Sequence, residues 1–129
     1  MKIEKGEIYY VVIKNTSGSE VSGTRPAVIV SNNTNNEKSN TVTIVPLTAS
    51  NPHKEYPFEA FLPAGEGGLP KDSRAKCNQI KTIDKSLLGD SIGKVGEDKM
   101  REIEIAIRFH LGMDTENDRL DHLQCPKIK

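Results

Sequence analysis

The chain has 129 residues, of which 35% are hydrophobic and 28% charged, and its 18 basic residues balance its 18 acidic ones. This length fits one domain with a single hydrophobic core. A net charge near zero argues against a protein that coats nucleic acid through bulk positive charge, so any such site must be a local patch or be shared by two copies. No run reaches the roughly 18 apolar residues of a membrane span, and the N-terminus MKIEKGEIYY has no signal-peptide core.

The two cysteines, Cys77 and Cys125, lie far apart in the sequence. They could pair, but two reduced thiols are the commoner case in a chain without a secretion signal. We therefore expect a cytoplasmic protein with no membrane partner.

Most of the chain carries β-strand patterns, bounded by clusters of Gly, Asn and Pro. In chain order the predicted strands are Glu7–Lys14, Pro26–Ser31, Thr41–Thr48, Tyr56–Leu62, Ser73–Ile83 and Ser91–Val95. Pro46, near the end of the third, predicts an edge position or a bulge. Alternation in the fifth predicts one face with Ala75, Cys77 and Gln79 and an opposite face with Arg74, Lys76 and Asn78.

One long segment has helical period, with apolar residues three and four apart at Met100, Ile103, Ala106, Ile107 and Leu111. Acidic residues in its first turn and a glycine just past its end indicate its limits: Glu97, Asp98 and Gly112. A single helical turn is predicted at Asp84–Leu88.

Short strands followed by one helix predict a mainly β (α+β) fold, a small β-barrel with a C-terminal α-helix packed on it. An antiparallel α+β sandwich is the alternative. No repeat or linker divides residues 1–113, which we expect to form one domain. The remainder, Asp114–Lys129, is polar and is predicted to be a solvated extension.

The sequence contains none of the common metal or phosphate motifs. Its three histidines stand alone without zinc-ligand spacing, and the glycines of AGEGGLP lack the Lys-Ser/Thr of a phosphate loop. No G-x-S-x-G element of a serine hydrolase is present. We expect no metal and no cofactor.

Polar residues at strand ends are the remaining candidates for chemistry. Arg25 precedes Pro26, which favours an extended backbone and would present the guanidinium fork to a phosphate. Thr48 and Ser50 place hydroxyls where the third strand ends, within reach of a phosphate oxygen. Taken locally, a surface salt bridge for the arginine and turn capping for the hydroxyls are the commoner roles.

Basic residues concentrate in one region, at Arg74, Lys76, Lys81 and Lys85. A solvated strand face is the ordinary explanation, and a surface that follows an RNA backbone is the functional one. Tyr9, Tyr10 and Tyr56 could stack on bases, although core packing is the commoner role for each.

Five blocks in order resemble the MazF/PemK family of toxin endoribonucleases. They are KGEIYYVV, GSEVSGTRPAVIVSNN, NTVTIVPLTAS, LPKDSRAKCNQIKTIDKSLLGDSIGKV and a helix ending HLG, which together span about Lys5 to Gly112. The resemblance implies an SH3-like barrel, a homodimer and cleavage of single-stranded mRNA at short sequences without metal. It further implies attack by the 2′-hydroxyl, products with 2′,3′-cyclic phosphate and 5′-hydroxyl ends, and a cognate antitoxin whose C-terminal segment blocks the RNA groove.

The family's site residues transfer to this chain position by position. The essential arginine of the G-x-R-P element matches Arg25, the hydroxyl closing the third strand matches Thr48, and the Ser-Glu of the first loop falls on Ser19 and Glu20. Two departures concern acid–base groups: Ser19 replaces a histidine of some relatives, and Lys76-Cys77-Asn78-Gln79 replaces Arg-Cys-Asp-Gln. We therefore expect Arg25 to stabilise the reacting phosphate, because arginine is a poor general base.

The remaining site residues are expected to bind RNA. Thr48 would orient the phosphate with Ser50 beside it, while Ser19, Glu20, Lys76, Asn78 and Gln79 would line the groove. Two alternatives from other classes stay open. One is a non-catalytic toxin on the same barrel that inhibits DNA gyrase by protein binding, and the other is an inactive interaction module.

Overall fold

The computed structural model describes residues 2–14 and 23–124. Its seven strands in that part of the chain are β1 (Glu7–Ile13), β2 (Gly23–Ile29), β3 (Thr41–Thr48), β4 (Glu59–Leu62), β5 (Ser73–Lys76), β6 (Lys81–Asp84) and β7 (Leu88–Lys94). The α-helices described are α1 (Asn33–Lys38), α2 (Glu97–His110) and α3 (Glu116–Gln124). Short 3-10 turns occur at η1 (Glu66–Gly68), η2 (Cys77–Gln79) and η3 (Lys85–Leu87), the last within the helical turn predicted from the sequence.

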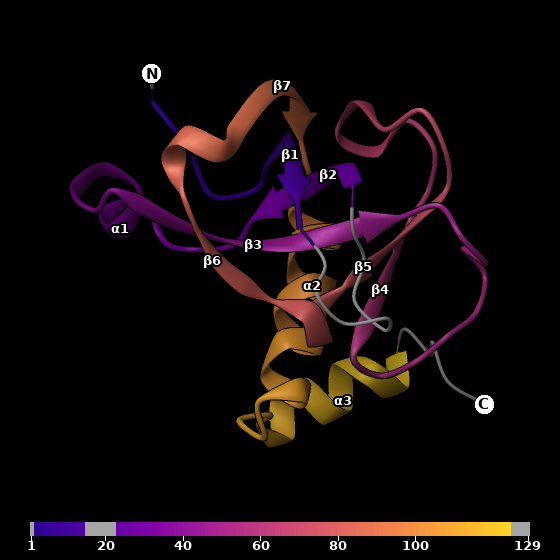
Figure 1. Cartoon of the computed structure of the whole chain (residues 1–129). Coiled ribbons are helices and arrows are strands. Elements are labelled where there is room, and N and C mark those ends of the chain that lie inside the picture. The colour runs from indigo at the N-terminus through magenta and orange to yellow at the C-terminus, as the bar shows by residue number, and fades with distance from the viewer. Residues whose placement is uncertain (1, 15–22, 125–129) are drawn as a thin grey trace.

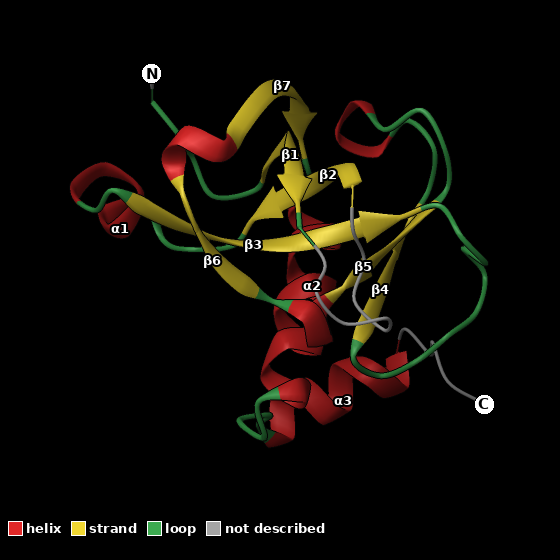
Figure 2. Ribbon diagram, viewed as in Figure 1, coloured by secondary structure: helices red, strands yellow, loops and turns green. Residues whose placement is uncertain are grey.

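The strands form a curved antiparallel sheet in the order β4-β5-β3-β2-β1-β7, and β6 pairs with the first half of β3. No described pairing joins β6 to β7, so the sheet is barrel-like but not closed. Figures 1 and 2 show α2 lying across one side of the sheet. The predicted mainly β fold with a C-terminal helix packed on it is confirmed.

Both faces of the sheet are buried, because neighbouring residues of one strand point to opposite sides. Ile8 and Val28 pack on one side with Ile103 of α2, in the first core cluster. Tyr9 and Ile29 belong to a second cluster on the other side. Double-sided burial explains why β2 and β3 are continuous apolar runs and do not alternate cleanly with polar residues.

The predicted fifth strand is two strands separated by η2. β5 pairs with Leu47 and Thr48, whereas β6 pairs with Thr41–Ile44, so β3 changes its partner partway along. The alternation predicted beyond Lys76 is therefore wrong, since Asn78 and Gln79 lie in the turn. Arg74 is also buried, not solvated.

Pro46 occupies an interior strand, and the edge position predicted from it is wrong. It pairs with Ala27 of β2 on one side. On its other side it falls between the segments of β3 that pair with β6 and β5. A residue without an N–H is tolerated at this point because the ladder there changes partner.

Helix α1 forms within a polar stretch for which the sequence indicated only a loop. The side chain of Asn32 caps it by accepting from the N–H of Asn35 at 2.8 Å. Asn36 is buried and donates to the carbonyl of Ser31 at 2.9 Å. Side-chain hydrogen bonds stabilise this helix, so its sequence has no apolar period from which it could be predicted.

The C-terminal region differs from its prediction in two ways. Leu111, predicted on the buried face of α2, is 51% exposed because the helix has already ended at His110. Part of the extension forms α3 instead of staying solvated, and its Asp118 is buried and bound to Arg108.

Candidate active site

Three predicted or basic side chains come together in one row across the sheet. Thr48 pairs directly with Arg74 of β5. Val28 pairs with Val45 and Ala27 with Pro46, and the same register carried two residues further sets Arg25 of β2 beside Thr48. Directly paired residues project from the same face. Strand β3 lies between β2 and β5 (Figure 1), so this register predicts that Arg25, Thr48 and Arg74 project from one face of the sheet.

Arg25 is half-buried, and it pairs with Val11 of β1. The predicted strand began at Pro26, but β2 begins at Gly23, so the arginine lies inside a strand and not at its entrance. A strand position restricts the directions that the guanidinium can take. The site thus presents this fork from a rigid element.

Thr48 ends β3 and leads into a turn whose backbone it holds. The residue is only 6% exposed, and its Oγ1 accepts from the N–H of Ser50 at 3.2 Å. Ser50 itself is exposed, and Asn51 after it has a φ of +46°, a left-handed conformation that asparagine tolerates. The two hydroxyl residues predicted at this strand end are thus joined by one hydrogen bond.

A buried ionic cluster lies next to this turn. The carboxylate of Glu59, 3% exposed, accepts from Nη1 of Arg74 through one oxygen and from Nζ of Lys76 through the other, each at 2.8 Å. Nε of Arg74 also donates to the carbonyl of Ser50 at 3.1 Å. We call Glu59, Arg74 and Lys76 the ionic cluster; it contains two cations and one anion.

The residues predicted to line the groove differ in their surroundings. Lys76 ends β5 with its ammonium bound to Glu59. Asn78 and Gln79 lie in η2, which contacts β3, β4 and α2. Oδ1 of Asn78 is buried and accepts no hydrogen bond within the part of the chain that the structure describes. An unsatisfied buried acceptor of this kind costs about 1–3 kcal/mol.

Ser19 and Glu20 lie outside the described residues. Two further residues lie near Thr48: Arg74, which the sequence placed only in a basic concentration, and Glu59, which had no predicted role. Alternation in the predicted strand placed Glu59 on the face opposite Phe58, Ala60 and Leu62. Its partners, however, depend on how β4 pairs with β5. That pairing sets Glu59 opposite Lys76 and Phe61 opposite Arg74.

Aromatic side chains border the ionic cluster on the segment before and within β4. Tyr56 and Phe58 stack with ring centroids 5.0 Å apart, and His53 meets Phe61 at 5.2 Å. Tyr9, by contrast, is a core residue, 2% exposed. Its hydroxyl donates to Glu7, and burial together with that carboxylate raises the pKa of Tyr9 to about 12.

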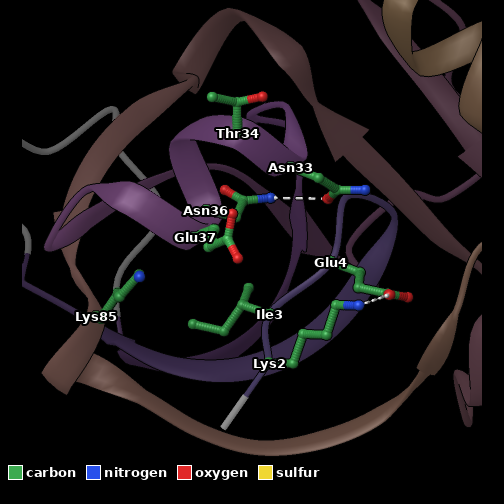
Figure 3. A pocket seen from close by; sticks show the side chains of 8 residues that line it. All are labelled: Lys2, Ile3, Glu4, Asn33, Thr34, Asn36, Glu37 and Lys85. Atoms are coloured by element: carbon green, nitrogen blue, oxygen red, sulfur yellow. Dashed lines mark hydrogen bonds and ion pairs between the residues drawn. The ribbon is translucent and has the colours of Figure 1, made fainter.

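A separate pocket of about 700 Å³ opens beside α1, and Ile3, Asn36 and Lys85 are among the residues that line it (Figure 3). It adjoins the start of β3, whereas Thr48 lies at the other end, roughly 23 Å away at the usual rise per residue. None of the predicted site residues lines it. Across the described ranges no three His, Cys, Asp or Glu residues group as metal ligands do, and no helix is long and apolar enough to cross a membrane.

Comparison with known proteins gives one family. A family model described as PemK-like, MazF-like toxin of type II toxin–antitoxin system matches residues 4–111. Endoribonuclease MazF9 of Mycobacterium tuberculosis is 35% identical over 116 residues, covering 86% of this chain and 98% of the relative.

Solved structures share the fold. MazF from Deinococcus radiodurans superposes with a TM-score of 0.74 at 24% identity, over 88% of this chain and 99% of that one. A mycobacterial endoribonuclease in complex with its cognate antitoxin gives 0.67 at 24% identity, over 88% and 97%. Helix α3 lies beyond the residues that the family model matches.

Proposed function

This chain belongs to the PemK-like, MazF-like toxins of type II toxin–antitoxin systems, and from that premise we propose that it is an endoribonuclease of the cytoplasm that cleaves single-stranded mRNA at short sequences. The observation that carries the proposal is the row of Arg25, Thr48 and Arg74 on one face of the sheet. It offers a phosphate the guanidinium of Arg25 and the hydroxyl of Thr48, both on rigid strands.

The proposed reaction is a transesterification that needs no metal. The 2′-oxygen forms a bond to the adjacent phosphorus and the bond to the 5′-oxygen breaks, leaving a 2′,3′-cyclic phosphate and a 5′-hydroxyl. Arg25 stabilises the dianionic pentacoordinate phosphate and donates a proton to the leaving oxygen, and water accepts the proton of the 2′-hydroxyl. Thr48 orients the phosphate, since its Oγ1 accepts from Ser50 and its own proton remains to be donated.

Further residues are proposed to bind the RNA around the scissile phosphate. Ser50 is exposed beside Thr48, and the half-buried Asn78 in η2 is proposed to contact a nucleotide. Gln79 and Lys76 complete this wall, and the family resemblance adds Ser19 and Glu20. The ammonium of Lys76 would contact the RNA while it stays paired with the carboxylate of Glu59.

The proposed partners are a second copy of the chain and a cognate antitoxin. A homodimer would double the positive row and so compensate for the net charge of zero. Relatives have been solved in complex with their antitoxins. We propose that the acidic C-terminal segment of an antitoxin occupies the RNA groove and folds as it binds.

The test is to incubate the purified protein with a long RNA in EDTA and to map the 5′ ends. We expect cleavage at a short repeated sequence, abolished in Arg25→Ala and reduced about 100-fold in Thr48→Ala, the usual loss for one transition-state donor. Thr43→Ala, a threonine of the same strand that bonds to Thr82, is the matched control and should cleave normally. Intact RNA with a folded wild-type protein would remove the proposal.

The alternative of a toxin that inhibits DNA gyrase by protein binding makes the opposite prediction. Gyrase supercoiling would be blocked by the wild type and equally by Arg25→Ala, while RNA stayed intact. No described feature favours it. An inactive module would affect neither RNA nor gyrase.

A further inference from the structure

We propose that Arg74 is a positioning residue of the RNA-cleaving site, oriented by Glu59, and that it acts by holding the turn that fixes the Thr48 hydroxyl. This inference rests on the proposed function, which assigns Thr48 to the phosphate. Neither Arg74 nor Glu59 enters the mechanism above as a group that touches the RNA.

Burial of the ionic cluster has a high desolvation cost. The side chain of Glu59 is 3% exposed, that of Arg74 10% and that of Lys76 16%. Buried ion pairs contribute little net stability, because desolvation offsets their attraction, and apolar residues of the same volume often serve stability equally well. A cluster of three charges next to Thr48 is therefore better explained by the direction that it imposes on a side chain.

Glu59 sets the orientation of the Arg74 guanidinium. Its Oε1 accepts from Nη1 at 2.8 Å, and Nε of the same guanidinium donates to the carbonyl of Ser50 at 3.1 Å. The guanidinium is planar and its donors keep fixed angles, so an anchor at Nη1 also orients Nε. A lysine at this position would keep the charge but could not make both bonds in this geometry.

Ser50 connects Arg74 to Thr48. The peptide groups of Ser50 are held from two sides, its carbonyl by Arg74 and its N–H by Oγ1 of Thr48 at 3.2 Å. The bond from the N–H occupies an acceptor position of the hydroxyl and thereby directs the remaining proton. If the Ser50 backbone moved, the Thr48 rotamer would lose this constraint. Arg74 thus acts on the RNA through Ser50 and Thr48.

The pairing of the strands supports the same connection. Thr48 lies directly opposite Arg74, and Glu59 lies opposite Lys76 two residues along β5. These side chains share one face, because residues two apart on a strand point to the same side. The cluster and the turn are consequently held by three hydrogen-bonded strands, the kind of support that a preorganised site requires.

The experiment is a double-mutant cycle between Arg74→Lys and Thr48→Ala, measured on a short RNA that contains the mapped cleavage site. We expect Arg74→Lys to lower kcat about 10-fold, a typical coupling loss, with KM changed less than about two-fold, since the charge is kept. In the Thr48→Ala background the same substitution should have almost no effect on kcat. Glu59→Gln should lower kcat in the same direction and serves if Arg74→Lys does not fold.

A matched control distinguishes positioning from simple loss of stability. Asp118→Asn breaks a part-buried two-bond pair with Arg108 at the α2–α3 corner. It should lower the melting temperature while kcat stays at the wild-type value. The Ser50 amide should exchange faster with solvent in Arg74→Lys and at the normal rate in Asp118→Asn.

Three results would overturn the inference. A normal kcat in folded Arg74→Lys would exclude the positioning role, and a raised KM with normal kcat would make Arg74 an RNA-binding residue instead. Equal losses of kcat in the wild-type and Thr48→Ala backgrounds would show that Arg74 does not act through Thr48. A wild-type protein that cleaves no RNA fails the proposed function itself, and the Ser50 exchange rate then still shows whether Arg74 holds the turn.

Discussion

At the scale of single residues, backbone approach decides where glycine is needed. Gly68 closes the η1 turn with a φ of +81°, and a Cβ there would collide with the carbonyl oxygen of Ile92 in β7. Gly65, in the same loop, also has a positive φ of +96°, but its Cβ would meet no atom within 4 Å. Both positions carry conformational strain for other residues, and only Gly68 adds a steric clash with a strand.

The pair of substitutions separates these two costs. Gly65→Ala should lower the free energy of unfolding by about 1–2 kcal/mol, the cost of a left-handed conformation for an alanine. Gly68→Ala should lower it by at least about 2 kcal/mol more, because β7 or the turn must shift. Urea unfolding of both variants measures the difference, and equal losses would show that the contact with Ile92 carries no cost.

For the basic residues of the candidate site, the type of residue did not predict its surroundings. Lys76 was predicted to line the RNA groove, and its ammonium is bound to a buried carboxylate. Arg74, assigned from the sequence only to a basic face, lies directly opposite Thr48. The cation that contacts the turn after Thr48 is therefore Arg74 and not Lys76, which the motif alone would select.

At the scale of elements, α1 depends on its cap. Asn32 accepts from the N–H of Asn35, and the helix has only six residues and no apolar period. Replacing the cap leaves an N–H without a partner at the helix end. Asn32→Ala should lower the free energy of unfolding by about 1 kcal/mol, and amide exchange should increase across 33–38. Asn32→Asp keeps an acceptor and should restore protection; loss of protection in both variants would contradict the capping role.

Asp118 makes two sets of hydrogen bonds at the start of helix α3. Asp118 accepts from Nε and Nη2 of Arg108, each at 2.6 Å, and it exchanges hydrogen bonds with Thr115 at the start of the helix. The hydrogen bonds from Arg108 are the main cause that lowers the pKa of Asp118 from 3.8 to about 2. The helix is thus attached to α2 through an ionised carboxylate.

This attachment predicts a pH dependence with a defined sign. Because the folded-state pKa lies below the ordinary value, the contribution of Asp118 to stability is complete above about pH 4 and is lost as the pH falls through about 2. The protection factors of the α3 amides against exchange should therefore fall between pH 4 and pH 2, before those of the sheet. Asp118→Asn should show fast exchange already at neutral pH. An α3 equally protected at pH 6 and pH 2 would contradict this role.

At the scale of the whole molecule, charge and assembly are connected. The chain has a net charge of zero, so the proposed attraction to RNA would depend on a local positive patch around Arg25 and on its repetition in a second copy. We predict that light scattering gives a mass of about twice 14.2 kDa under the conditions of cleavage. Full activity at concentrations where the protein is monomeric would contradict the dimer.

How far the sequence determines this protein can be argued from particular elements. Apolar runs and alternation were sufficient for β1, β2, β3 and α2, because burial of one or both faces leaves a local period in the chain. Blocks such as GTRP and PLTAS were sufficient to mark Arg25 and Thr48, and the match to the toxin family supports those blocks without testing the roles of the two residues.

Tertiary structure alone decided the surroundings of those residues. Glu59, Arg74 and Lys76 are brought together by the register of β4 against β5, and the turn at η2 exists because β3 changes partner between β5 and β6. Helices α1 and α3 are held by side-chain hydrogen bonds and an ion pair, which leave no apolar period. Burial is recorded locally in the order of residues, whereas the pairing of charges across strands depends on long-range register, which no local pattern contains.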